Sequence, residues 1–231
     1  MIILNIHTSR VKAKKIDEMI KEQLLKKSQE LFVLAFLRYT YPEKYGDVIH
    51  SDSPDLQGKT IAVEVTSADS PQDIQATKEF KKYCTDHNDL RKKTILEHSN
   101  MKIVTLENTY ILCEGGGYNC NNQTLISRIN DKIDKAQRYS DKCKTLELAI
   151  IKTDRPLQPW IDSLNDMIRP LLNENNPYNT IYVIFPNAYF IIEKNKDGEL
   201  HQLDSEIYQS LKKIGRMTAE GELSFKDEEW N

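Results

Sequence analysis

Residues 54–66, which read PDLQGKTIAVEVT, decide the fold. After Gly58 apolar and other residues alternate, and the apolar ones share one face of a strand: Ile61, Val63 and Val65. Glu64 lies on the opposite face of that strand. A glycine between two extended arms favours a tight turn, so the stretch predicts a β-hairpin that turns near residues 57–58.

A helix over residues 16–39 is predicted ahead of the hairpin. Apolar residues recur every three or four positions in its first half, and residues 31–37 (LFVLAFL) are apolar on every side. A helix that is apolar all round is buried, so we expect its second half at the centre of the core. The segment leading into this helix and its first half are basic instead, with lysines at positions 12, 14, 15, 21, 26 and 27.

Beyond the hairpin the chain alternates between helical and extended patterns. Helices are expected over residues 71–98, 122–142 and 159–172. Residues 102–106 and 109–113 are expected to form one strand or a small hairpin, and further strands are expected over 146–151, 181–185, 189–193 and 199–201. This order predicts an α/β fold in which a mixed central sheet is flanked by helices. The 231 residues are interpreted as one domain, 1–231, with an α/β insertion at 67–121 and a frayed tail at 224–231.

The charge balance bears on possible partners. The chain has 32 Lys and Arg against 35 Asp and Glu, a net charge of -3. This excludes a uniformly basic nucleic-acid coat but leaves room for a local basic surface, because binding follows the distribution of charge. The positive residues gather on 10–27 and on one flank of 128–142, so we expect any nucleic-acid surface there.

No segment is typical of export or of a membrane span. Residues 1–7 are too short an apolar stretch for a signal peptide, and no window approaches the ~18 apolar residues of a span. The four cysteines are few for this length and are expected to be reduced thiols. The sequence therefore predicts a cytoplasmic protein with no membrane partner.

Two carboxylates stand on the arms of the predicted hairpin. Asp55 ends one arm, and Glu64 lies in the other, pointing away from the apolar face. Carboxylates brought together in this way are ligands for a hard divalent cation such as Mg²⁺ or Mn²⁺. Such an ion activates water and stabilises the charge that develops on a phosphodiester under attack.

The pattern Pro54-Asp55…Glu64-Val65-Thr66, after a helix that carries Glu30, resembles the PD-(D/E)XK nuclease superfamily, the restriction-endonuclease-like fold. The resemblance covers roughly residues 16–66 and 122–193. It implies metal-dependent cleavage of nucleic acid, usually DNA. Asp55 and Glu64 would be the catalytic acids and metal ligands, Val65 would lend its carbonyl oxygen, and Glu30 would be the additional glutamate of the first helix.

The chain departs from this family where a lysine is expected, because Thr66 stands there. A hydroxyl cannot supply the positive charge of an ammonium. Lys132 and Lys135, on one flank of the helix over 122–142, are the candidates for a relocated basic group or a contact to the DNA backbone. The same flank also suits an ordinary solvated helix edge, and Glu30 also suits a solvated helix position.

The sequence thus predicts a metal-dependent nuclease, an Mg²⁺-dependent endodeoxyribonuclease. Cutting both strands of a duplex needs two active sites, so a homodimer is an expected form. The first alternative is a catalytically inactive nuclease-fold protein that binds nucleic acid or a protein partner. The second is an unrelated α/β interaction module in which Pro54-Asp55 is only a turn.

Overall fold

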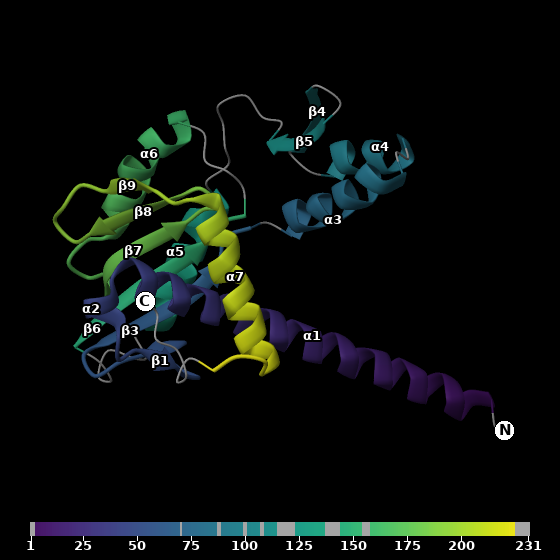
Figure 1. Cartoon of the computed structure of the whole chain (residues 1–231), viewed down its shortest axis with the longest axis horizontal. Helices are drawn as coiled ribbons and strands as arrows, with labels where there is room; N and C mark the ends of the chain where they lie inside the picture. The colour runs from purple at the N-terminus through teal and green to yellow at the C-terminus, as the bar shows by residue number, and fades with distance from the viewer. Residues whose placement is uncertain are drawn as a thin grey trace. The chain divides into compact units, whose positions relative to one another are not determined.

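The computed structural model describes residues 3–69, 71–86, 89–98, 101–106, 109–114, 123–136, 144–153 and 158–224 (Figure 1). The chain folds into two compact units. The first comprises Met1–Val65, Cys143–Thr145 and Asp204–Asn231. The second comprises Thr66–Lys142 and Leu146–Leu203.

The protein has a mixed α/β architecture with a seven-stranded sheet flanked by helices. The strands follow the order β1-β2-β3-β6-β7-β8-β9. Their bounds are Ile49–His50, Leu56–Gln57, Ile61–Ser67, Thr145–Ile151, Tyr178–Ile184, Ala188–Glu193 and Glu199–Gln202. β6 and β7 are parallel, whereas β1/β2, β2/β3, β7/β8 and β8/β9 are antiparallel. The prediction of a mixed sheet is confirmed.

The predicted hairpin is formed by β2 and β3 in the first unit. Leu56 pairs with Val63, and Gln57 pairs with Ala62. The amide of Gly58 donates to the carbonyl of Ile61 over 2.8 Å and closes the turn. Alternation of side chains along a strand has period two, so this register turns Glu64 away from Val63 and Val65.

Helix α1 (Ile3–Thr40) supplies the core of the first unit, and α2 (Pro42–Tyr45) follows it. Every residue of 31–37 is 3% exposed or less, which confirms the predicted burial of this run. The helix begins well before residue 16 because no proline or glycine interrupts the chain before Pro42.

Helix α7 (Ser205–Glu220) packs against α1 within the first unit. No helix or strand is predicted for these residues from the sequence. The side chain of Asp204 caps its first turn, accepting from the amide of Glu206. Gly221 ends it in the left-handed conformation, at φ 81°. The rings of Tyr208 and Phe32 meet edge to face with centroids 5.1 Å apart.

The second unit contains the parallel pair β6 and β7 with the antiparallel strands β8 and β9. Its helices are α3 (Pro71–Asp86), α4 (Asp89–His98), α5 (Gln123–Ala136), α6 (Gln158–Ile168) and the 3₁₀ turn η1 (Arg169–Leu171). β4 (Met101–Leu106) and β5 (Thr109–Glu114) form a separate antiparallel ribbon. These two strands and the turns after β7 and β8 agree with the predicted pattern.

Three expectations reach beyond what the structure tests. The helix predicted over 122–142 is described as far as Ala136, and residues 137–142 lie outside the described residues. Residues 225–231 of the predicted tail lie outside them too. One domain with an insertion at 67–121 stays a prediction.

None of the described helices is both long and apolar enough to cross a membrane.

Gly215 marks the closest approach of α7 to α1. A Cβ atom added there would lie 2.5 Å from the backbone nitrogen of Phe32 and 2.8 Å from the carbonyl oxygen of Ser28. Because both obstacles are backbone atoms, no side chain can move to relieve the clash. We expect Gly215→Ala to lower the free energy of unfolding by about 1–3 kcal/mol in urea denaturation.

Alanine is intrinsically better than glycine in a helix by about 1 kcal/mol, so the clash must outweigh that gain. Ser210→Ala, at an exposed position of the same helix, is the control and should leave stability unchanged or raised. A Gly215→Ala protein as stable as the parent would contradict the close approach.

Candidate functional site

Asp55 lies directly before β2 and is held against β3. Its side chain is buried, with the residue only 4% exposed. Its Oδ2 atom accepts a hydrogen bond from the amide of Val65 over 2.8 Å, and its carbonyl accepts one from the amide of Ser51. Since Leu56 pairs with Val63, Asp55 and Glu64 are the next residues along the two paired strands. Glu64 is also 4% exposed, so both hairpin acids are buried.

Glu30 brings a third buried carboxylate to the first unit from α1. The residue is 5% exposed, which excludes the alternative that it is a solvated helix position. Its Oε2 atom lies 2.7 Å from Nε2 of His50, on β1. Glu30 is therefore oriented by a side chain from the strand next to β2.

Lys26 links two of these acids. Its Nζ atom lies 3.1 Å from Oε1 of Glu30, one helical turn further along α1, and 3.5 Å from Oδ1 of Asp55. The lysine side chain is 67% exposed, whereas the two carboxylates are buried. A flexible cation thus reaches from solvent to a position between two buried carboxylates.

The pKa of Lys26 reflects this position. Partial burial alone lowers the pKa of an ammonium, but the negative charges of Glu30 and Asp55 outweigh that effect. The net pKa of Lys26 is raised above its ordinary value of 10.5, and the side chain stays charged at neutral pH. Buried acids without such partners would be costly, so Lys26 stabilises the ionised pair.

The donor set suits a hard cation. Carboxylate oxygens are the ligands that Mg²⁺ and Mn²⁺ take in proteins. The carboxylates of Glu30 and Asp55 already hold one positive group between them, the ammonium of Lys26. Oε1 of Glu30 is buried, and the group that it faces within the described part of the chain is the ammonium of Lys26, 3.1 Å away. Among the residues that the structure describes, no three His, Cys, Asp or Glu side chains are already grouped as metal ligands.

The predicted basic residues belong to the other unit. Lys132 and Lys135 lie on α5, where Lys135 is exposed and Lys132 is half-buried. The carbonyl of Lys132 accepts a hydrogen bond from the hydroxyl of Tyr178. Glu30, Asp55 and Glu64 all belong to the first unit, so the roles of Lys132 and Lys135 stay predictions.

Lys26 and His50 complete the cluster, and neither is among the site residues predicted from the sequence. The spacing of four residues between Lys26 and Glu30 is the signal of a helical ion pair. His50 precedes the turn that leads to Asp55, a place that suits either a residue near the metal or a structural strand histidine, and the structure pairs it with Glu30. The second unit has a buried acid of its own, Asp69, which accepts hydrogen bonds from the amide of Thr153 and the hydroxyl of Ser67.

No family model, no curated protein and no solved structure matches the chain.

The raised pKa of Lys26 predicts how the cluster responds to alkali. A pKa above the unfolded value means that the ion pairs stabilise the fold fully below about pH 10.5 and lose that effect as the pH rises through the folded pKa. The stability difference between the parent and Lys26→Met should therefore shrink above about pH 10.5. Urea midpoints measured across this range give the difference.

Lys27→Met, which removes an exposed charge one residue further along, is the control for general lysine titration. Its stability should follow the parent at every pH. Parallel curves for the parent and Lys26→Met above pH 10.5 would show that Lys26 does not pair with the buried acids.

Proposed function

We propose that the protein is a metal-dependent nuclease with a restriction-endonuclease-like fold that cleaves phosphodiester bonds. The observation that carries the proposal is the cluster at the hairpin, in which buried Asp55 and Glu30 share the ammonium of Lys26. Buried acids held together at a cost in stability are typical of functional sites. The resemblance of the hairpin to the PD-(D/E)XK motif favours DNA over RNA as substrate.

Asp55 and Glu64 are the proposed ligands of Mg²⁺ or Mn²⁺, with Glu30 assisting and Val65 offering its carbonyl oxygen. The amide of Val65 fixes one oxygen of Asp55, which leaves Oδ1 on the side of Lys26. His50 orients Glu30 in a similar way through Oε2. When bound, the ion supplies an activated water and positive charge for the phosphate.

Lys26 is the proposed source of the positive charge that Thr66 cannot supply. Its Nζ lies within 3.5 Å of oxygens of both Glu30 and Asp55, so the ammonium is already at the cluster. A lysine is a compact charge on a flexible stem, and most of this side chain is exposed. It can therefore turn toward a phosphate oxygen or hold a water by donating a hydrogen bond. Lys132 and Lys135 remain candidates for backbone contacts.

The same ion pairs favour a second candidate function. An ammonium between Glu30 and Asp55 already neutralises charge that a divalent cation would neutralise, and Thr66 replaces the usual lysine. A catalytically inactive nuclease-fold protein that binds nucleic acid or a protein partner would have this arrangement. Metal-dependent cleavage separates the two candidates.

Asp55→Asn tests the nuclease directly. The amide keeps the shape of the side chain but removes a charged ligand, so we expect DNA cleavage in Mg²⁺ or Mn²⁺ to fall by about a hundredfold or more. Gel assays on single-stranded and duplex DNA and on RNA measure the rate and the substrate class. A homodimer in solution would favour cleavage of both strands.

Asp52→Asn makes the same chemical change at an exposed position three residues away and should keep the parent rate. Absence of cleavage by the parent, or cleavage that Asp55→Asn leaves intact, would contradict the nuclease and favour the inactive alternative.

Lys26→Met tests the relocated charge. We expect the cleavage rate at saturating metal to fall by roughly a hundredfold, because no ammonium then meets the phosphate or the water. Lys26→Arg should retain part of the rate, since it keeps the charge. If Lys132→Met or Lys135→Met abolished cleavage while Lys26→Met did not, the catalytic charge would lie on α5 instead.

A further inference from the structure

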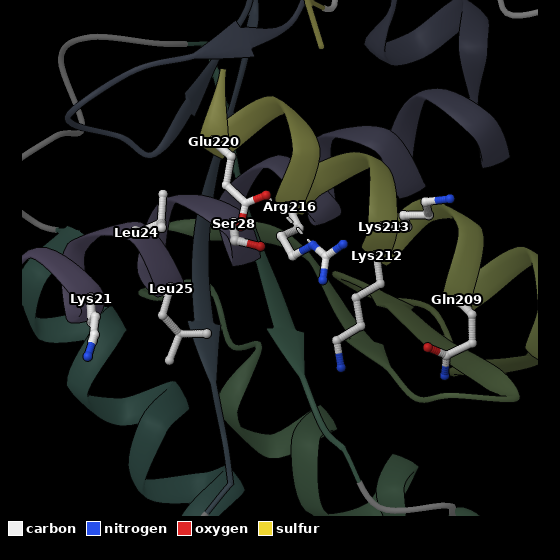
Figure 2. Close-up of a pocket in the computed structure, with 9 residues that line it drawn as sticks. All are labelled: Lys21, Leu24, Leu25, Ser28, Gln209, Lys212, Lys213, Arg216 and Glu220. Atoms are coloured by element: carbon white, nitrogen blue, oxygen red, sulfur yellow. Dashed lines mark ion pairs between the residues drawn. The ribbon is translucent and has the colours of Figure 1, made fainter. Parts of the chain in front are cut away.

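A basic groove lies between α1 and α7 in the first unit, with a cavity volume of about 590 Å³ (Figure 2). We call this cavity the α1/α7 groove. Its basic and apolar lining residues are Lys21, Leu24, Leu25, Lys212, Lys213 and Arg216. Ser28, Gln209 and Glu220 complete the walls. The volume lies in the range of sites that bind ligands.

Each wall of the groove is one stripe of a helix. On α1 the lining positions 21, 24, 25 and 28 follow the three- and four-residue spacing of a single face. On α7 the positions 209, 212, 213, 216 and 220 do the same. The two walls lie close together at Gly215, between the lining positions 213 and 216, where an added Cβ atom would lie 2.8 Å from the carbonyl oxygen of Ser28.

The groove is strongly positive although the chain has a net charge of -3. Among the described residues four cations line it, Lys21 on α1 and Lys212, Lys213 and Arg216 on α7, against one acid, Glu220. Oε2 of Glu220 lies 3.9 Å from Nε of Arg216, and the side chain of Arg216 is 63% exposed. The ion pair is therefore long and open to solvent. Leu24 and Leu25 make the α1 wall partly apolar, and Leu25 is 61% exposed.

The groove is separate from the carboxylate cluster. At 100° per residue, Glu30 lies roughly 180° around α1 from Lys21. The two surfaces therefore occupy opposite faces of the same helix, and the groove is not a continuation of the site at Asp55. A ligand in the groove is anchored away from the proposed catalytic residues.

We infer that the α1/α7 groove binds the backbone of a single-stranded nucleic acid. Phosphates meet the lysines and the arginine of the two walls, and the sugars lie over Leu24 and Leu25. The cations stand on both sides of the groove, so the negative charges of the ligand must enter between them. A single strand can do this, whereas a duplex presents its phosphates on a broad convex surface.

The lining also determines the kind of binding. Within the described part of the chain no aromatic side chain lines the groove for bases to stack on, so we expect recognition to depend on charge and to be independent of sequence. Such binding weakens steeply with salt, with log K falling by about 0.7 per unit of log salt for each phosphate neutralised on a single strand. Four cations predict a slope of about −3.

The inference is tested by measuring the binding of the full chain to a labelled oligodeoxythymidine by fluorescence anisotropy. The affinity is measured at several salt concentrations in the presence of EDTA. Without divalent metal the measurement reports binding alone, so its outcome is independent of the proposed nuclease. We expect Lys212→Gln/Lys213→Gln to make the salt slope shallower by about 1.4, since two phosphate contacts are lost. Lys59→Gln/Lys144→Gln removes the same charge at exposed positions outside the groove and outside the basic stretches 10–27 and 128–142, and should keep the parent slope.

Three results would overturn the inference. The first is equal binding by the two double variants, or no binding by the parent. The second is displacement of the oligonucleotide by polyglutamate or by duplex DNA as effectively as by unlabelled single strand, which would assign the groove to acidic protein segments or to duplex. The third is a parent dimer that only the groove variant dissociates in analytical ultracentrifugation, which would make the groove an interface between copies.

Discussion

The burial of residues 31–37 in α1 is the constraint on which the rest of the first unit depends. These seven side chains are apolar and buried on every side of the helix, so the core surrounds this stretch of α1. Because the helix is continuous, this places Glu30 at the edge of the core and Lys26 one turn further out. The side chain of Lys26 is mostly exposed, and its ammonium contacts the buried carboxylate of Glu30.

The carboxylate cluster depends on partners that come from separate segments. The amide of Val65 and the imidazole of His50 each hold one oxygen of a buried acid. The ammonium of Lys26 balances part of the negative charge of Glu30 and Asp55. Its side chain is long and 67% exposed to solvent. Without Lys26 the buried acids would lose a compensating charge, so the lysine contributes to the stability of the fold as well as to the proposed site.

Helix α1 presents two different surfaces because α7 crosses it at a glycine. The missing side chain of Gly215 lets the two backbones approach, and residues on either side of it line the basic groove together with one stripe of α1. On the other side of α1, Lys26 and Glu30 face the hairpin. One helix therefore serves a proposed catalytic site and a proposed anchoring site without either using the residues of the other.

The sequence by itself determined the elements whose signal is local. The alternation at 61–65 and Gly58 predicted the hairpin and its turn, and the apolar run at 31–37 predicted a buried helix, because both signals lie within one segment of the chain. Burial of Glu30, the reach of Lys26 to Asp55 and the approach of His50 were decided only by tertiary structure. Each depends on contacts between segments twenty or more residues apart, or on how deeply a helix enters the core, and no local pattern encodes that distance. The groove required the same information, since its two walls are more than 180 positions apart in the chain.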